Sequence, residues 1–432
     1  MGIIAALRED VIPIFIYLVL FSGVIAGIVW RAEIPVVLLA IFMPLPTIWY
    51  TTHAYPFGKD AIDLLFISAA IGVSINKGGY KKTPLFTLVI ATVVYTYISL
   101  LICSSRFGLP QPITLENPFL ASWKNYVLMF LIYLVAYNAT TSEKQVKWVI
   151  NTCIGVLAFM VFQELRSFTA GASFSYGKRS DGPFWIAGLN ANHFAAYVAY
   201  IGIFALGLSI YAIARRSRWV YALTFIGSLY PLLFSYSRGA YAAMLGAITL
   251  YGLIKKRSII VLVLLFLVSW QSLLPPSVIE RIEMTESESG NLEESASQRI
   301  EVWNEAVSIF KNHTIMGIGY SGFVIATQSL VLHDTHNYYL KIAAEQGLVG
   351  LGLWLAFLLL IALSALRLTG TGKSSQSKSI GFGTLGCITA VMICNFFGDR
   401  FSQIEVGGTL MLIFAMTQRQ TQLDSINTPM DS

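Results

Sequence analysis

His336 is the side chain in this sequence best suited to acid–base chemistry, because it stands where a polar loop meets the apolar run 337–366. An imidazole there can take up or release a proton near neutral pH while one of its sides is shielded from water. His336 is therefore a candidate general base. A structural interpretation is equally open, in which His336 and Asn337 cap a membrane helix and Gly347 and Gly350 allow a neighbouring helix to approach.

Two arginines could bind an anion near this histidine. Arg238 stands in Ser237-Arg238-Gly239 between two apolar segments, and Arg299 begins a stretch with apolar residues at helical spacing. An arginine beside a membrane is costly unless it meets water, a lipid head group or an anionic ligand, and its planar guanidinium suits phosphate. Each has an ordinary interpretation as well: Arg238 can reach the interface from a helix end, and Arg299 can pair with a nearby carboxylate.

Four further polar residues lie in the loop before the apolar segment 190–213 or at the start of that segment. These residues could line a sugar or phosphate pocket together with Asn337, although a solvated loop explains the charges equally well: Lys178, Arg179, Asn190 and Asn192.

The sequence gives little support for metal or cofactor chemistry. His333 and His336 have the spacing of a zinc pair, but no third ligand can be placed beside them. A DxD pair, a P-loop, a GxSxG elbow and an HExxH motif are all missing from the sequence. We therefore expect neither a metal nor a cofactor, and an enzyme acting on phosphorylated donors would neutralise the leaving group with arginines.

The elements that position these residues are membrane helices. The 432 residues are 56% hydrophobic and only 12% charged, and the mean hydropathy is +0.66. These values indicate an all-α polytopic membrane protein, in which the four cysteines are core residues. Apolar runs give about 13 candidate spans: 12–30, 34–50, 60–75, 84–104, 123–139, 147–165, 190–213, 219–235, 239–254, 258–274, 337–366, 380–397 and 403–418.

The basic residues predict how these spans are oriented. Fourteen of the 29 lysines and arginines fall in short clusters that share one side if each segment crosses once, at 77–82, 144–147, 215–218, 255–257 and 367–378. The positive-inside rule makes this side cytoplasmic, explains the net charge of +6 and argues against a nucleic-acid partner. Only the amino terminus disagrees, because Arg8 would lie outside unless the first hairpin is misjudged.

Four regions follow from this topology: amino-terminal membrane helices in 1–274, a large outer loop in 275–335, carboxy-terminal membrane helices in 336–418 and a cytoplasmic tail in 419–432. The large loop contains an acidic stretch, Glu283 to Ser297, that we expect to be mobile. After it comes a predicted amphipathic helix, capped by Ser295 or Ser297, with its apolar side at Ile300, Trp303, Val307 and Phe310. Gly317 to Gly322 spells GxGxxG, which without a preceding strand predicts only a turn.

Three motifs give the chain a resemblance to the O-antigen ligase and polymerase superfamily of bacterial envelope glycan enzymes. They are Ser237-Arg238-Gly239, Gln298-Arg299 with Trp303, and the segment that begins at His336. The last is the most specific: His-Asn followed after nine residues by Gly-x-x-Gly is typical of the ligases and is complete here at His336, Asn337, Gly347 and Gly350.

This resemblance implies an inverting glycosyltransferase of the GT-C type, with about 12 to 13 membrane helices and one large periplasmic loop. Such an enzyme transfers a glycan from undecaprenyl diphosphate to an acceptor at the periplasmic face of the bacterial inner membrane. The resemblance implies that His336 deprotonates or orients the acceptor hydroxyl and that Arg238 and Arg299 bind the donor diphosphate. Besides the membrane lipids, the expected partners are this donor and lipid A-core as acceptor.

Other functions stay open at this point. A polymerase of lipid-linked repeat units, or a ligase that modifies a protein or another envelope polymer, would use arginines in the same way. A transporter is more remote, because the polar residues gather on one face of the membrane and no internal repeat is evident.

Overall fold

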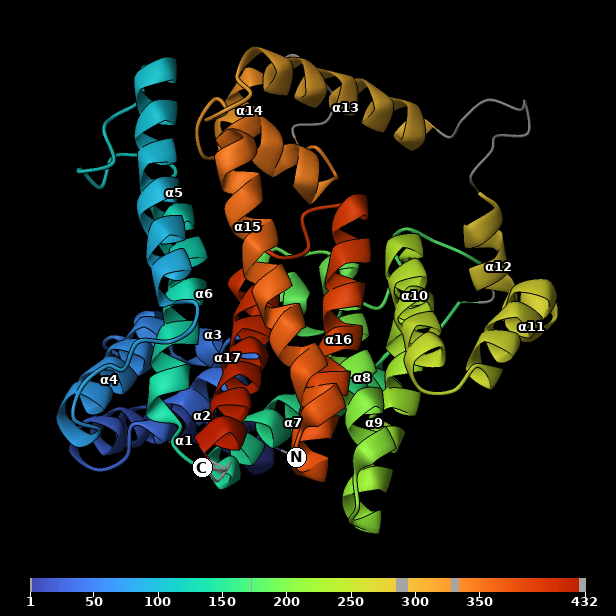
Figure 1. Cartoon of the computed structure of the whole chain (residues 1–432), viewed down its shortest axis with the longest axis horizontal. Coiled ribbons are helices and arrows are strands. Elements are labelled where there is room, and N and C mark those ends of the chain that lie inside the picture. Colours follow the sequence, from blue (N-terminus) through green and yellow to red (C-terminus); the bar gives the residue numbers. More distant parts are fainter. Residues whose placement is uncertain (1, 172, 285–293, 328–333, 427–432) are drawn as a thin grey trace, which may run out of the picture.

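The computed structural model describes residues 2–171, 173–284, 294–327 and 334–426 (Figure 1). Every regular element in these ranges is a helix, as the composition predicts: α1 (Gly2–Val29), α2 (Glu33–Phe42), α3 (Pro46–Thr52), η1 (Gly58–Asp60), α4 (Ala61–Asn76), α5 (Phe86–Phe107), α6 (Leu120–Ala139), α7 (Glu143–Ser167), η2 (Gly182–Ala187), α8 (Ala191–Tyr211), α9 (Arg215–Phe234), α10 (Arg238–Ile254), α11 (Ser258–Leu273), α12 (Pro276–Glu283), α13 (Glu294–Asn312), α14 (Gly322–Ala326), α15 (Tyr338–Thr371), α16 (Ser375–Cys394), η3 (Asn395–Phe397) and α17 (Ile404–Ile426).

Helices α8 and α16 form the centre of the bundle, and small residues let them approach closely. A Cβ atom on Gly207 of α8 would lie only 2.4 Å from the Cα of Gly383 in α16. Tyr251 of α10 donates its hydroxyl proton to the carbonyl of Ile203 at 3.0 Å, which satisfies the buried phenol. Small-residue contacts of this kind are typical of membrane helices.

The clusters of basic residues lie at one end of this bundle, hereafter the basic end, as the sequence predicts. Lys77 approaches Glu33 at 3.6 Å, and Gln145 donates to the same carboxylate at 2.6 Å. At this end Lys255 lies over the ring of Tyr211, 4.1 Å from its centroid. Because Glu33 directly follows α1, the carboxyl end of α1 lies at the basic end. The orientation of the amino terminus stays a prediction, since the bent pair α2 and α3 can be a broken span or a re-entrant loop.

The number of helices that resemble full membrane spans is smaller than expected. Seven helices in the described ranges are long and apolar enough to cross a bilayer, or nine if the bent pairs α2 with α3 and α11 with α12 each count once. The other predicted segments are also helical, but α4 has 16 residues and α10 has 17. Helix α9 begins with Arg215 and Arg216, and the last turns of α17 are polar. These polar ends lower the mean hydropathy of α9 and α17.

Helix α17 also runs past its predicted end. It continues through Ile426, so residues 419–426, which we assigned to the tail, belong to this helix. Residues 427–432 lie outside the described ranges.

Helix α15 contains a sharp break that the sequence analysis did not foresee. Gly347 has φ 63° and ψ −162° in the middle of the helix. The segment 314–319 fits into this break: Ile318 N donates to Ala344 O at 3.0 Å, and Leu348 N donates to Thr314 O at 2.8 Å. A Cβ on Gly347 would lie 2.2 Å from Ile315 O. Gly347 therefore allows a loop to approach α15, whereas the sequence had suggested the approach of a neighbouring helix.

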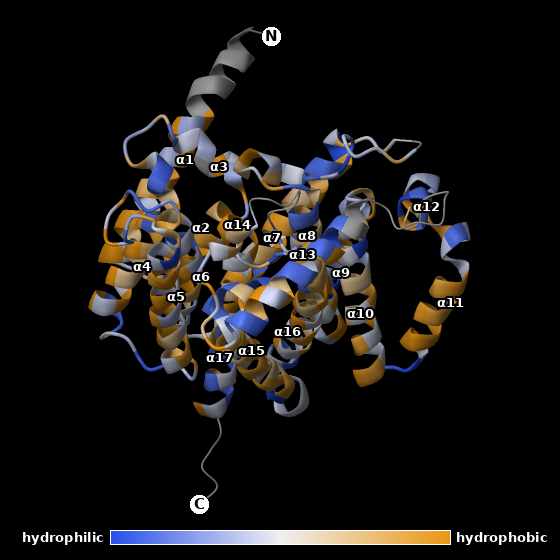
Figure 2. Cartoon of the chain, turned by 90° about the horizontal axis from the view of Figure 1, so that it is seen from above, coloured by the Kyte–Doolittle hydropathy of each residue, from blue (hydrophilic) through white to orange (hydrophobic). Residues whose placement is uncertain are grey.

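The large loop carries the predicted amphipathic helix, α13, which lies across the top of α15 in Figure 1 and is largely hydrophilic in Figure 2, in contrast to α11. Its buried residues are Val302, Ala306 and Ile309, which pack against α14 and α15. Trp303, Val307 and Phe310 lie at the edge of this face, and Ile300 is exposed, so the predicted face was wrong by about one residue.

Two further predictions concern the start of α13 and the acidic stretch before it. The helix begins at Glu294, ahead of both serines that we proposed as caps. Most of the acidic stretch that we expected to be mobile, residues 285–293, lies outside the described ranges.

Candidate active site

His336 is held in a tight turn at the start of α15. Its backbone has φ 48°, in the left-handed region that few residues other than glycine adopt. The hydroxyl of Thr335 donates to the carbonyl of Asn337 at 2.8 Å, and the carboxamide oxygen of Asn337 accepts from Tyr339 N and Leu340 N. Asn337 is thus the N-cap of α15, and the turn directs His336 away from the helix.

The environment of His336 favours a neutral imidazole. Its side chain is 28% exposed, and Nδ1 faces the carboxylate of Asp334 at 3.6 Å. Burial lowers the pKa of His336, Asp334 opposes this effect, and the positive charges of Arg299 and Arg400 lower the pKa further, so the net shift is downward. Asp334 favours a proton on Nδ1, which leaves Nε2 able to accept one. A neutral imidazole at pH 7 is the form that a general base requires.

Helix α13 covers the turn that carries His336. The indole nitrogen of Trp303 donates to the carbonyl of Thr335 at 2.8 Å. Arg299 lies one helical turn earlier and is half-buried, close enough to act electrostatically on His336. The Gln-Arg and Trp motif and the His336 motif, which are separated in the sequence, therefore meet at one place.

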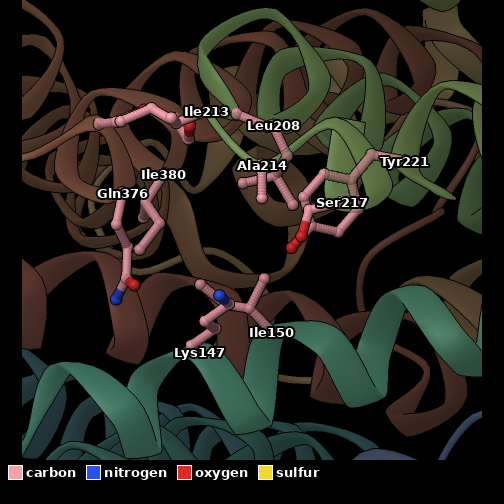
Figure 3. A pocket seen from close by; sticks show the side chains of 12 residues that line it. Lys147, Ile150, Leu208, Ile213, Ala214, Ser217, Tyr221, Gln376 and Ile380 are labelled. Carbon is pink, nitrogen blue, oxygen red and sulfur yellow. The ribbon is translucent and has the colours of Figure 1, made fainter. Parts of the chain in front are cut away.

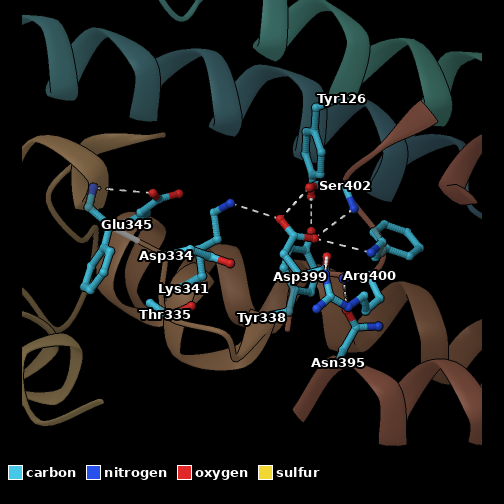
Figure 4. A network of polar contacts seen from close by, with 12 residues as sticks. Tyr126, Asp334, Thr335, Tyr338, Lys341, Glu345, Asn395, Asp399, Arg400 and Ser402 are labelled. Atoms are coloured by element: carbon cyan, nitrogen blue, oxygen red, sulfur yellow. Dashed lines mark hydrogen bonds and ion pairs between the residues drawn. The ribbon is translucent and has the colours of Figure 1, made fainter. Parts of the chain in front are cut away.

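The loop between η3 and α17 contributes a buried ion pair to the same region (Figure 4). Lys341 donates to Asp399 at 2.9 Å, and the backbone of Ser402 donates to the same carboxylate at 3.0 Å. Burial alone would raise the pKa of Asp399, but Lys341 and Ser402 lower it to about 2. The ion pair fixes this loop to α15, because breaking a buried pair is strongly unfavourable.

Arg400, the residue after Asp399, is only 7% exposed. Its backbone N–H donates to Asn395 Oδ1 at 3.0 Å, and its guanidinium contacts His193 Nε2 at 3.2 Å. His193 Nδ1 lies 3.0 Å from the carboxamide oxygen of Asn190. Because that oxygen can only accept, His193 carries its proton on Nδ1 and is a neutral acceptor for Arg400.

Arg179 lies close to both Arg400 and a further arginine, Arg281. Arg179 donates to Ser235 O and to Asn192 Oδ1, both at 2.7 Å. Burial lowers the pKa of Arg179 to about 10, and the charges of Arg281 and Arg400 add to this effect. Arg281, 8% exposed, lies over the rings of Phe174 and Tyr176. Half-buried Arg179 is thus repelled by two buried arginines, an arrangement that an anion would stabilise.

Arg238 is half-buried at the first position of α10. The next residue, Gly239, lies so close to η3 that a Cβ there would be 2.6 Å from Phe397 Cβ. The start of α10 therefore lies beside the loop that carries Arg400.

Apart from Arg238, the predicted site residues fall into three groups. His336 and Arg299 are brought together, and Arg179 meets Asn192. Asn190 and Asn337 act as helix caps for α8 and α15, and their carboxamide oxygens are already engaged. Lys178 is exposed, in contrast to its neighbour Arg179. The binding roles that we gave to these residues stay predictions.

The sequence analysis missed Arg281, Lys341, Asp399 and Arg400. Asp399 and Arg400 follow Gly398 between the last two apolar segments, the same setting as Arg238, and the cost of an arginine beside a membrane could have identified Arg400. No such signal marks Arg281 within the large loop.

A metal site was considered at His333 and His336. His333 lies outside the described ranges. Within those ranges, no three His, Cys, Asp or Glu side chains gather closely enough to hold a metal ion.

Comparison with known proteins agrees with the motifs. No curated protein matches the sequence. The model of the family described as O-antigen ligase matches residues 223–355, from within α9 into α15, a region that contains Arg238, Arg299 and His336. Together with the multi-pass helical fold, this match supports membership of the O-antigen ligase and polymerase superfamily.

Proposed function

We propose that this protein is an inverting glycosyltransferase that moves a glycan from undecaprenyl diphosphate to lipid A-core at the periplasmic face of the inner membrane. The observation that carries the proposal is the position of His336, whose lowered pKa leaves it neutral beside Arg299 and Arg400. A base and a group of cations in one place suit a reaction that removes a proton and creates a negatively charged leaving group.

In this proposal each group acts on a different part of the reaction. His336 Nε2 takes the proton of the acceptor hydroxyl, and the hydroxyl oxygen attacks the anomeric carbon of the donor. The bond between that carbon and the diphosphate oxygen breaks, and its electron pair stays on the diphosphate. Arg238 and Arg299, together with Arg400, stabilise the charge that develops there.

Lys341 and Asp399 would act indirectly. Their ion pair holds the backbone of the loop in which Arg400 lies, so we assign them a positioning role. We propose lipid A-core as the acceptor because the complete His336 motif favours a ligase over a polymerase.

The experiment that tests the proposal uses purified protein in detergent with EDTA. Undecaprenyl-diphosphate glycan and lipid A-core are supplied separately and together, and the wild type is compared with His336→Ala. We expect the core to gain a glycan in one step, only when both substrates are present, with a rate that falls about 10²–10⁴-fold in the variant. Lys178→Ala, a nearby exposed position, is the control and should stay active.

Other products would replace the proposal. Lengthening of the lipid-linked glycan without lipid A-core would indicate a polymerase. Transfer that requires a divalent metal would contradict the mechanism, and a fully active His336→Ala would remove its general base.

A further inference from the structure

A cavity at the basic end is not used by the proposed reaction. It has a volume of about 230 Å³ and lies between the first turns of α7, α9 and α16 and the last turn of α8 (Figure 3). Its polar side is formed by Lys147, Ser217, Ser375, Gln376 and Ser379. Helix α8 has 21 residues and carries Asn192 and His193 at its other end, so the cavity is roughly 30 Å from the candidate active site.

Two hydroxyls on the polar side of the cavity lack partners in the described part of the chain, whereas Ser375 donates to Tyr211 O and Gln376 donates to Glu143 O. Ser379 is only 6% exposed, yet its hydroxyl makes no hydrogen bond to any residue in the described part of the chain. The hydroxyl of Ser217 likewise has no partner there. Both residues line the cavity, so their hydroxyls are available to donate to a ligand with acceptor oxygens.

The charge around the cavity favours an anion. Lys147 is exposed at its edge. The N-cap of α9, Ala214, has no side chain that could accept from the first N–H groups of that helix. Arg218 caps the end of α8 through Ala212 O at 2.8 Å, which keeps its positive charge beside the opening.

The apolar side of the cavity and its surroundings fit a membrane lipid. Ile150, Ile213 and Tyr221 line it. Trp148 and Trp219 are exposed on the two flanking helices, and tryptophans of this kind mark the level of the lipid head groups. Leu223 and Ile226 follow on the exposed side of α9, where acyl chains would lie.

We propose that this cavity binds the phosphate of an anionic phospholipid from the leaflet at the basic end, with Lys147, Ser217 and Ser379 as its ligands. Basic pockets between membrane helices on that side are suited to phospholipid head groups. The site is distinct from the candidate active site and does not depend on the proposed transferase reaction.

The test measures thermal unfolding of delipidated protein in detergent, titrated with phosphatidylglycerol, phosphatidylcholine or inorganic phosphate. We expect phosphatidylglycerol to raise the Tm saturably and phosphatidylcholine to have little effect. Lys147→Gln should raise the half-saturating lipid concentration about fivefold. Lys144→Gln, an equal change of charge one turn earlier on α7 but outside the cavity, should change it less than about twofold.

Three results would overturn the proposal. Equal effects of Lys144→Gln and Lys147→Gln would reduce the binding to general surface charge, and an equal response to phosphatidylcholine would remove the requirement for an anion. Inorganic phosphate that reproduces the full Tm increase would identify a site for a soluble anion. Ser379→Ala offers a second variant with a smaller change of structure and should also weaken binding, without affecting the Tm of the lipid-free protein.

Discussion

Cations gather at both ends of this helix bundle, but their surroundings differ. At the basic end Arg215, Arg216 and Lys147 are exposed. At the opposite end Arg281 and Arg400 are almost fully buried. Exposed cations cost little and set the orientation of a membrane protein, whereas buried cations must be stabilised by a specific partner. Burial, and not the number of positive charges, therefore distinguishes the candidate active site from a topology signal.

Removing one cation from each end of the bundle tests this difference most directly. Arg400→Gln should lower the rate of glycan transfer about 10²–10³-fold, because a buried charge aimed at the leaving group is lost. Arg216→Gln at the basic end should change the rate less than about twofold, since an exposed charge contributes little. Initial rates with saturating acceptor measure both. Equal losses, at unchanged Tm, would contradict the distinction.

The break in α15 belongs only to the active-site end and can be tested by stability. Gly347→Ala places a Cβ against the carbonyl of Ile315 in a left-handed conformation, so we expect a loss of about 1–3 kcal/mol in the free energy of unfolding.

Gly352 is the matched control for this change. It lies in the same helix with nothing within 4 Å of an added Cβ. Thermal unfolding in detergent should therefore show a lower Tm for Gly347→Ala and no decrease for Gly352→Ala. A Tm that is unchanged in both variants would mean that the break does not need glycine.

Two adjacent cations in one loop also differ in their surroundings. Arg179 is turned toward Asn192 and Ser235, whereas Lys178 is exposed. Arg179→Gln should raise the KM for the lipid-linked donor about tenfold, the effect of one charge-assisted contact, and Lys178→Gln should leave it unchanged. If Lys178→Gln has the larger effect, the donor approaches from the solvent side of the loop.

The smallest predicted effect concerns pH. Because burial and two arginines lower the pKa of His336 below its ordinary value of 6.5, more than half of the imidazole is neutral at pH 6.5, and the midpoint of the fall in kcat/KM should lie at lower pH. Asp334 raises this pKa, so Asp334→Asn should move the acidic limb of the profile to still lower pH, by about one pH unit or less. A shift in the opposite direction would show that Asp334 does not face the titrating group.

Much of the fold could be predicted because hydropathy acts over whole helices. Each of the 13 apolar segments overlaps a helix, and the basic clusters meet at one end. The break at Gly347 could not be predicted, because it depends on a loop about thirty residues earlier that supplies the missing hydrogen bonds. The face of α13 was misjudged for a similar reason, since the contact of Trp303 with Thr335 is set by tertiary packing.

The candidate site was predictable only where its chemistry is local. His336 stands at an obvious boundary between loop and membrane, and its motif is contiguous. Arg281 becomes a candidate only once the structure places it near Arg179, and nothing in its own segment of the sequence reveals that proximity. For Asn190 and Asn337 we predicted substrate binding, but both residues cap helices. Capping is the ordinary role of an asparagine directly before an apolar helix.

The insertion of segment 314–319 into α15 also bears on how this protein could diversify. The segment is anchored by main-chain hydrogen bonds, such as Gly319 N to Glu345 O at 2.8 Å, and these do not depend on the identity of most side chains. Apart from Arg299 and Trp303, the side chains of α13 and its connections can therefore change while this helix keeps its place above His336. An enzyme built in this way could adapt to new acceptors by drift in one loop, with the reacting groups left undisturbed.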